Sequence, residues 1–299
     1  MNNLTFRLLE VFQHVADCGS VTAASEQLSL SQPTVSLQLK KLNTMCGLPL
    51  LETHQGQLHM TEAGRAVYRC AQDVLNAQAK LTSHIQALKG VEVGSLRLAV
   101  VTTAKYIIPP LLADFCKAHP GIDVHLKVGN RAQIIERLQQ NRDDIYIFSH
   151  PPEALKVDVQ RFMPNRLHVI ASADYRGPDN CRLEDIIEYK FLLREPGSGT
   201  RLAVDEFCER HDIHMHNTML IESNEAIKLA VASGLGLAIL SEYTLAQSPD
   251  PRVKILHIDG FPLRSYWHAV TLSNRPLSLA SQSFAKHLAD YGKQFHLED

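Results

Sequence analysis

The chain has 299 residues, of which 45% are hydrophobic and 21% are charged, and its formal net charge is −2. The length exceeds that of most single domains, and the composition is typical of a soluble globular protein. A net charge near zero excludes a protein that is basic throughout, so any contact with DNA is expected to be local. The sequence has no run of about 18 apolar residues and no secretory signal, which predicts a cytoplasmic protein without membrane contact.

The first 42 residues have the pattern of three short helices. Apolar residues recur at helical spacing from Leu4 to Val15, and Gly19-Ser20 ends that run and caps a second helix. Pro33 suits the first turn of a third helix, whose apolar face begins at Val35 and leaves short polar side chains outside. Two helices joined by a tight turn, the later of which has a polar outer face, are typical of a unit that enters the major groove of DNA. A three-helix packing unit with a solvated face is the alternative.

Residues 19–42, GSVTAASEQLSLSQPTVSLQLKKL, resemble the DNA-binding helix-turn-helix of LysR-type transcriptional regulators, in which the A-A-x-x-L and S-Q-P-x-V-S elements have this spacing. The resemblance implies a winged helix-turn-helix over residues 1–60, with double-stranded promoter DNA as its partner. In such a unit phosphate contacts set the register and base contacts set the sequence choice. By the resemblance, Gln32, Pro33, Thr34 and Ser36 face bases or sugars, whereas Ser20, Thr22, Ser31, Gln38 and Lys40 lie nearer phosphates.

Two features depart from that family. Leu37 stands where many relatives have an arginine, and LLETHQG, residues 50–56, lacks the basic pair of their wing. Residues 1–60 contain three lysines and arginines against four carboxylates. Because affinity that depends on phosphate contacts falls with salt, we expect a shallow salt dependence per subunit.

A long helix is expected from Thr61 to about Gly90. Its apolar positions alternate four and three apart for about three heptads, which favours a helix that pairs two subunits over one that lies on its own domain. The resemblance makes residues 61–90 a linker and dimerisation helix, so the operator would be roughly two-fold symmetric. It also implies a homotetramer, and RNA polymerase as a further candidate partner. The seam residues are Val67, Ala71, Val74, Gln78, Leu81, Ile85 and Leu88.

From Ser95 onward, short apolar runs alternate with helical stretches in two successive sets. This order predicts an α/β fold in which parallel strands are covered by helices, with the ligand at the carboxyl ends of the strands. The same residues resemble the effector-binding domains of LysR regulators, which have the periplasmic-binding-protein-like fold. The resemblance implies an effector-binding domain over residues 95–299, with lobe I at about 95–163 and 267–299 and lobe II at about 164–266.

The segment REPGSGTR, residues 194–201, raises the choice between catalysis on a phosphate and recognition of an anion. Its glycines let backbone N–H groups converge, but it lacks the Lys-Ser/Thr ending of a P-loop. We therefore expect an anion-binding turn in which Arg201 supplies the charge and Arg194 is structural.

Other candidate ligand contacts follow strands, where backbone donors and short hydroxyl side chains suit a carboxylate or a phosphate. Such residues serve equally well as caps of their own helices. Asn130 is followed by Arg131 at one of these places. The predicted effector-binding residues are Thr102, Thr103, Asn130, Pro151, Glu195, Gly197, Ser198, Gly199, Thr200, Arg201, Ser223 and Asn224.

Five strings resemble the CbbR-type branch of the family, which regulates carbon-fixation operons. They are RLAVVTTAKYIIP, VGNR, LREPGSGTR, SNEAIKLAVASGLGLAILS and DGFPL. The resemblance implies phosphorylated sugars, related acids or nicotinamide nucleotides as effectors. Tyr146 departs from the pattern, and a phenol facing the cleft floor would narrow the cleft. The target operon stays open, with a regulator of sulfur metabolism that senses an inorganic oxyanion as the alternative.

The rival functions find little support in the sequence. The cysteines occur singly, as reduced thiols do, and HDIHMH, residues 211–216, is better explained as a polar loop than as a zinc site. Neither a G-x-S-x-G nor a Walker sequence occurs, and a solute-binding protein would leave the helix-turn-helix unexplained. We therefore expect a DNA-binding regulator without catalytic residues, metal or cofactor, whose small anionic effector alters operator binding or bending.

Overall fold

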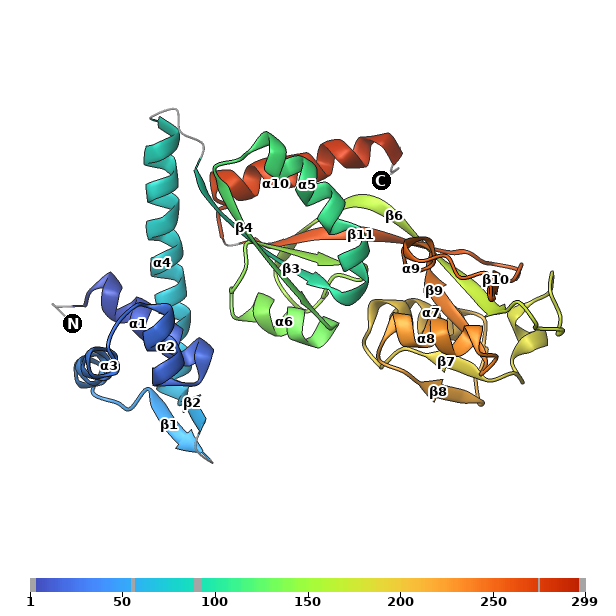
Figure 1. The fold of residues 1–299 in the computed structure, drawn as a ribbon, viewed down its shortest axis with the longest axis horizontal. Coiled ribbons are helices and arrows are strands. Elements are labelled where there is room, and N and C mark those ends of the chain that lie inside the picture. The colour runs from blue at the N-terminus through green and yellow to red at the C-terminus, as the bar shows by residue number, and fades with distance from the viewer. Residues whose placement is uncertain (1–3, 55–56, 89–92, 274, 296–299) are drawn as a thin grey trace. The chain divides into compact units, whose positions relative to one another are not determined.

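The computed structural model describes residues 4–54, 57–88, 93–273 and 275–295. The chain divides into two compact units, one of residues 1–92 and 140–142 and the other of residues 93–139 and 143–299 (Figure 1). Each unit is described by itself. None of the described helices is long and apolar enough to cross a membrane.

Unit 1 begins with helices that start at hydroxyl side chains. The side chains of Thr5, Ser20 and Ser31 each accept a hydrogen bond from a backbone N–H in the first turn of the helix that follows, which stabilises that turn. A glycine with positive φ, Gly19 or Gly47, ends α1 and α3. The elements are α1 (Phe6–Cys18), α2 (Val21–Gln27), α3 (Gln32–Cys46), and the antiparallel pair β1 (Leu51–His54) and β2 (Gln57–Met60).

The core of these helices follows the predicted apolar spacing. Phe12 and Val15 of α1 are fully buried. Leu42 of α3 lies in the same core cluster as Phe12, and Val35 of α3 lies in the same cluster as Val15. The opposite side of α3 is mostly exposed. The predicted division of α3 into an apolar and a polar face is confirmed.

Helix α4 (Glu62–Leu88) has two different halves. Tyr68 and Ala71 are buried, and the Tyr68 ring packs in the core of unit 1 with Phe12. Farther along, the side chains of Leu81 and Ile85 are 62% and 44% exposed. The first half of the expected seam therefore packs on the helix's own unit, and the second half is an exposed apolar stripe. The side chain of Leu88, and Gly90 as the expected end of the helix, lie outside the described residues.

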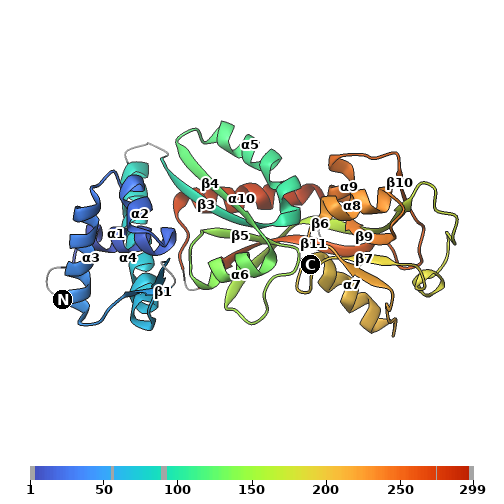
Figure 2. The same ribbon diagram turned by 60° about the horizontal axis from the view of Figure 1, so that its bottom comes forward.

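The described strands of unit 2 form one continuous sheet in the order β4-β3-β5-β11-β6-β9-β7-β8, with β10 paired to β6 (Figures 1 and 2). β3 pairs in parallel with β4 and β5, and β7 pairs in parallel with β8 and β9. Lobe I contains β3 (Gly94–Val101), α5 (Ile108–Ala118), β4 (Ile122–Gly129), α6 (Arg131–Gln139) and β5 (Ile145–Phe148). Lobe II contains β7 (Phe191–Leu193), α7 (Gly199–Arg210), β8 (Thr218–Leu220), α8 (Asn224–Ala232) and β9 (Leu237–Ser241).

Two long antiparallel strands, β6 (Val157–Ser172) and β11 (Leu263–Leu272), run through both lobes. The expected lobe boundaries fall inside them, and their register shifts between Trp267 and His268. Helix α10 (Leu279–Gly292) returns to lobe I, where Phe284 packs against Phe115. The remaining elements are η1 (Thr102–Tyr106), η2 (Leu183–Ile186), α9 (Glu242–Gln247), β10 (Val253–Ile255) and η3 (Lys293–Phe295).

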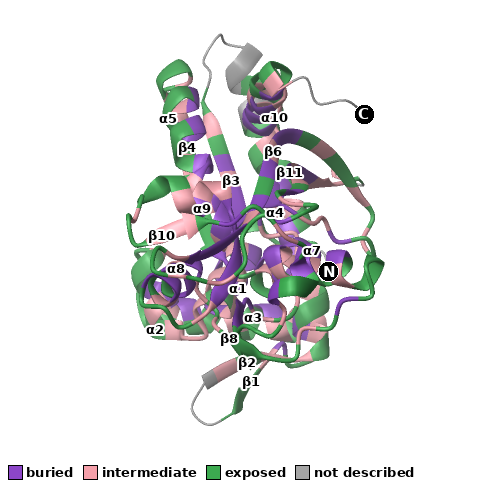
Figure 3. Ribbon diagram, turned by 90° about the vertical axis from the view of Figure 1, so that its right-hand side faces the viewer, coloured by how far each residue is buried: buried purple, intermediate pink, exposed green. Residues whose placement is uncertain are grey.

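The buried residues of unit 2 follow the sheet through both lobes (Figure 3). Tyr146 belongs to the core of lobe I and is fully buried. Its hydroxyl donates to the carbonyl oxygen of Arg137 at 3.1 Å and accepts from the backbone N–H of Asp143 at 2.8 Å. The expectation that Tyr146 faces the cleft floor is therefore wrong, because strand β5 directs this ring into the core.

Candidate DNA-binding face and effector pocket

Helix α3 presents a row of exposed polar side chains. Gln32, Ser36 and Lys40 are spaced four residues apart, so they share one face, and all three are exposed. Pro33 is exposed in the first turn, whereas Thr34 is half-buried and its hydroxyl lies 2.8 Å from that of Ser31. This face offers side-chain amide, hydroxyl and ammonium donors, the groups that contact base edges and phosphates.

The remaining predicted DNA contacts have mixed surroundings. Thr22 is exposed, while Ser20 and Ser31 cap α2 and α3, so both hydroxyls also have a structural role. Gln38 is half-buried. The exposed fraction of Leu37 is 68%, which leaves an apolar side chain on the outside of α3.

Positive charge is sparse on residues 1–60 of unit 1. Arg7 pairs with Glu10 at 2.7 Å, so Lys40 and Lys41 are the cations of α3 available to phosphates. On the wing, Glu52 lies 3.6 Å from His54. This charge distribution agrees with the shallow salt dependence expected from composition.

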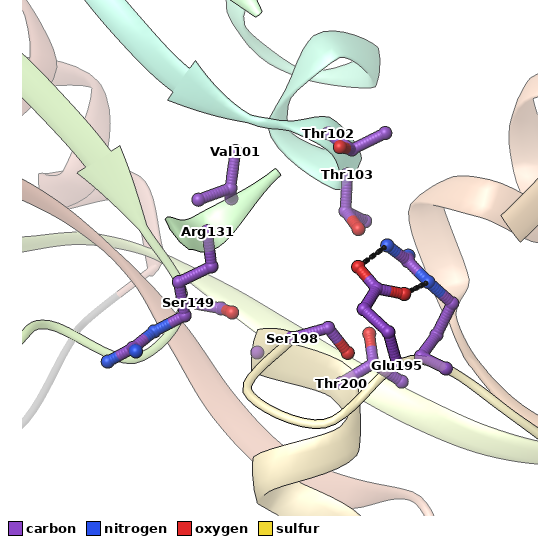
Figure 4. A pocket seen from close by; sticks show the side chains of 10 residues that line it. Val101, Thr102, Thr103, Arg131, Ser149, Glu195, Ser198 and Thr200 are labelled. Atoms are coloured by element: carbon purple, nitrogen blue, oxygen red, sulfur yellow. Dashed lines mark hydrogen bonds and ion pairs between the residues drawn. The ribbon is translucent and has the colours of Figure 1, made fainter. Parts of the chain in front are cut away.

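In unit 2 a pocket lies between the lobes, where the segments after β3, β4, β5 and β7 meet (Figure 4). The open space in it is about 280 Å³, counted together with adjoining solvent, and a second open pocket of about 680 Å³ on the same measure adjoins it along α6. Arg131, Glu195 and Ser198 line both. The first pocket is otherwise lined by Val101, Thr102, Thr103, Ser149, Arg194, Gly199 and Thr200. The second is otherwise lined by Asn130, Ala132, Ile135, Glu136, Gln139, Pro196 and Gly197.

The glycine-rich turn shapes the pocket wall. Gly197 has φ +83°, a conformation that side chains with a Cβ rarely adopt, and Ser198 then caps α7 by accepting from the backbone N–H of Arg201 at 3.1 Å. A Cβ added at Gly199 would lie 2.1 Å from the Oγ atom of Ser149. Gly199 therefore lets the start of α7 approach the end of β5 across the cleft.

Arg194 lines the first pocket, whereas Arg201, the expected source of charge, does not. The guanidinium of Arg194 lines the pocket with only 4% of its side chain exposed, bonded to Glu195 and to the side-chain oxygen of Asn224. Arg201 lines neither pocket. It pairs with Asp205 at 2.7 Å and donates to the carbonyl oxygen of Arg194 at 3.2 Å. A salt bridge along α7 holds Arg201, whereas the loop after β7 turns Arg194 inward.

Arg131 was one of the cleft candidates that follow a strand, but it was not among the predicted effector-binding residues. Its Nε and one Nη each donate to the carbonyl oxygen of His150 at 3.3 Å. Burial lowers the pKa of this guanidinium, which still stays protonated. Among the described residues no carboxylate lies within 4.0 Å of it. Arg131 is therefore a half-buried cation at the junction of both pockets.

The remaining predicted residues divide by role. Asn130 caps α6 and lines the second pocket, and Ser223 caps α8. Asn224 donates to the hydroxyl oxygen of Thr103 at 2.8 Å, which joins the lobes beside the pocket. Pro151 lines neither pocket. Ser149, which directly follows β5, lines the first pocket and was not predicted. Its position after a strand could have identified it.

Two family models match the chain. One, described as bacterial regulatory helix-turn-helix protein, lysR family, matches residues 6–65, and the LysR substrate binding domain matches residues 89–293. The HTH-type transcriptional activator CmpR of Synechocystis sp. is 41% identical and covers 96% of each chain. The RuBisCO operon transcriptional regulator of Acidithiobacillus ferrooxidans is 38% identical over 96% of this chain and 94% of its own length.

Solved structures agree with these matches. The Synechocystis CcmR regulatory domain in complex with 2-PG is 42% identical, with a TM-score of 0.62 over 67% of this chain and 97% of that chain. Full-length CbnR complexed with its target DNA has a TM-score of 0.67 over 96% of this chain and 100% of that chain, but at 21% identity it shows the fold alone. The relatives are regulators and not enzymes. The chain therefore belongs to the LysR family of DNA-binding bacterial transcriptional regulators, within the group that includes regulators of RuBisCO operons.

Proposed function

We propose that this regulator binds a small, multiply charged anion in the pocket between its lobes, and that the bound anion changes how the protein holds or bends promoter DNA. The observation that carries the proposal is Arg131, a half-buried cation without a carboxylate partner among the described residues, which lines both pockets. The 42% identity to a domain bound to 2-PG supports a small anion as the ligand class.

The lining of the first pocket suits such an anion. The hydroxyl-bearing residues Thr103, Ser149, Ser198 and Thr200 line it together with Arg131, whose guanidinium is directed away from Thr103, Ser198 and Thr200 (Figure 4). Helix α7 starts at this pocket, and the amino end of a helix favours negative charge. Hydrogen bonds between a guanidinium and an anion are roughly twice as strong as neutral ones. These groups come from both lobes, so an anion held by them links the lobes.

Linking the lobes gives the anion a route to the DNA. If it binds one arrangement of the lobes more tightly, it shifts the protein toward that arrangement, and the coupling to DNA affinity is reciprocal. We propose that residues 1–60 bind the operator through the predicted contacts on α2 and α3. We further propose that residues 61–90 pair two subunits through the exposed stripe that includes Leu81 and Ile85, within a tetramer that also contacts RNA polymerase.

The target we propose is an operon of carbon metabolism, because relatives that span nearly the whole chain regulate RuBisCO operons. A role in sulfur metabolism has no comparable support in these relatives. The helix-turn-helix match does not favour a solute-binding protein.

The test uses full-length protein and its own promoter DNA. Operator affinity and DNA bend angle are measured with and without saturating 2-PG, for the wild type, Arg131→Gln and a control, Arg210→Gln, at an exposed arginine at the far end of α7. We expect 2-PG to change affinity or bend in the wild type and the control, and Arg131→Gln to bind DNA without responding. The same affinity and the same bend with and without 2-PG or inorganic phosphate in the wild type would contradict the proposal.

A further inference from the structure

The pocket holds a negatively charged group of its own. The Nε and one Nη of Arg194 donate to the two carboxylate oxygens of Glu195 at 2.7 and 2.8 Å. The side chains of Arg194 and Glu195 are only 4% and 18% exposed, so the pair is largely withdrawn from water. Neighbouring residues in extended chain point to opposite sides. Here both turn into the pocket.

This pairing has the geometry that arginine uses for a carboxylate or phosphate ligand, with two parallel N–H···O bonds. The remaining Nη of Arg194 donates to Asn224, which holds the guanidinium in place. In Figure 4 the Glu195 carboxylate lies between the side chains of Thr103 and Thr200. The carboxylate therefore stands where an anion would accept both of these hydrogen bonds from Arg194.

The carboxylate also has a space to move into. Glu195 lines both pockets, and the second is the larger, at about 680 Å³ against about 280 Å³. Pro196 and Gly197 of the same turn line that second pocket too. Rotation of the Glu195 side chain toward the second pocket would leave the bond between Arg194 and Asn224 in place.

We propose that Glu195 is a tethered competitor for the effector: its carboxylate occupies the anion position, and an effector binds Arg194 only by displacing it. The inference rests on the proposed function, because it assigns a gate to the same pocket. A tethered group competes at a high effective concentration. The apparent affinity for the effector is the intrinsic affinity multiplied by the fraction of molecules in which Glu195 has left the site. A ligand with one carboxylate gives Arg194 the same charge and the same two hydrogen bonds as Glu195 does. Displacement of Glu195 therefore favours ligands that carry more negative charge than one carboxylate.

The test compares full-length wild type with Glu195→Gln and with Glu209→Gln, a control that removes the same charge from the exposed far end of α7. Binding of inorganic phosphate, 2-PG and acetate is measured by titration calorimetry at pH 8. We expect Glu195→Gln to bind phosphate and 2-PG about tenfold more tightly than the wild type, since the competing charged pair is lost. Acetate should bind measurably to that variant alone, and Glu209→Gln should match the wild type.

Thermal melting separates gating from mere structural support. Without anion, Glu195→Gln should melt below the wild type, because Arg194 has lost its charged partner, and phosphate should raise its melting temperature more than that of the wild type. A variant that is less stable but binds phosphate no more tightly than the wild type would overturn the gate. If the wild type itself shows no binding of phosphate or 2-PG that depends on Arg131, the proposed function fails instead.

Discussion

The α3 face of unit 1, which we propose binds DNA, and the pocket of unit 2, which we propose binds an anion, are built in opposite ways. The α3 face comes from a single helix, and Gln32, Ser36 and Lys40 remain exposed. The pocket is assembled from segments far apart in the chain, and its Arg194 is buried against Glu195. A surface that meets a long polyanion can leave its donors solvated, whereas a buried guanidinium needs a partner even when no ligand is bound.

The largest effect is expected from filling the cleft at Gly199. A valine there would place its Cβ 2.1 Å from the Ser149 Oγ atom and bring two further methyl groups into the pocket wall. Because these methyl groups occupy space that the anion would fill, we expect anion affinity to fall about thirtyfold, which is about 2 kcal/mol, while operator affinity without effector is unchanged. Titration with 2-PG and a DNA-binding assay measure the two quantities.

Gly199→Ala is the graded control, because rotation of the Ser149 side chain relieves the contact with a single methyl group. Its loss of affinity should be smaller than that of the valine variant. Unchanged 2-PG affinity in the valine variant would show that the effector binds elsewhere.

A second pair of substitutions tests the α3 face. Gln32→Ala should lower operator affinity about tenfold and relax sequence choice, because a side chain that reads a base edge contributes about 1–3 kcal/mol of discrimination. Lys40→Ala should weaken binding to all sequences alike and reduce the salt slope by about 1. Binding curves on operator and scrambled duplexes at several salt concentrations distinguish the two. Equal losses on both duplexes for Gln32→Ala would remove it from the predicted base contacts.

Ser31 allows capping to be separated from phosphate contact. Ser31→Ala should destabilise unit 1 by about 1 kcal/mol, since its hydroxyl caps α3. Ser31→Asp keeps a capping oxygen and should retain stability, but its charge would repel a phosphate and weaken operator binding about fivefold. Denaturation curves and binding assays measure the two effects. An aspartate variant with wild-type operator affinity would place Ser31 away from the backbone of the DNA.

The smallest effect concerns acid stability within unit 2. Burial raises the pKa of Glu225, but hydrogen bonds from Lys105 and Tyr106 in lobe I outweigh it and lower the pKa to about 2, against 4.5 ordinarily. Its contribution to stability is therefore complete above about pH 4.5 and is lost as the pH falls toward 2.

Almost half of the Glu225 side chain is exposed, so solvent screening limits that contribution to about 1 kcal/mol. Glu225→Gln should lower the unfolding free energy by about that amount at pH 7 and by less at pH 4. Denaturant unfolding at pH 7, 5 and 4 measures it, with the exposed Glu222→Gln as the control. If the difference in unfolding free energy between wild type and Glu225→Gln grew as the pH fell, the folded protein would not lower the pKa of Glu225.

The sequence anticipated features that depend on residues close together in the chain. Ser20, Ser31 and Pro33 marked the starts of α2 and α3, because caps and first-turn prolines act within one turn of a helix. The alternation of strands and helices likewise predicted the two lobes, although α9 and β10 are too short to have produced a pattern. Family resemblance then supplied the DNA-binding function that periodicity had left open.

What needed tertiary structure was the direction in which side chains point. Arg194 and Arg201 are seven residues apart in one turn, and only the path of the loop after β7 decides which of them enters the pocket. Tyr146 is directed into the core by its strand, and the seam of α4 is divided by the packing of Tyr68 against α1. Local sequence determined where helices begin and strands end, since those choices depend on hydrogen bonds within a few residues. Only the folded chain decided that Arg131, Arg194 and Glu195 share one pocket, because contacts between distant segments set that arrangement.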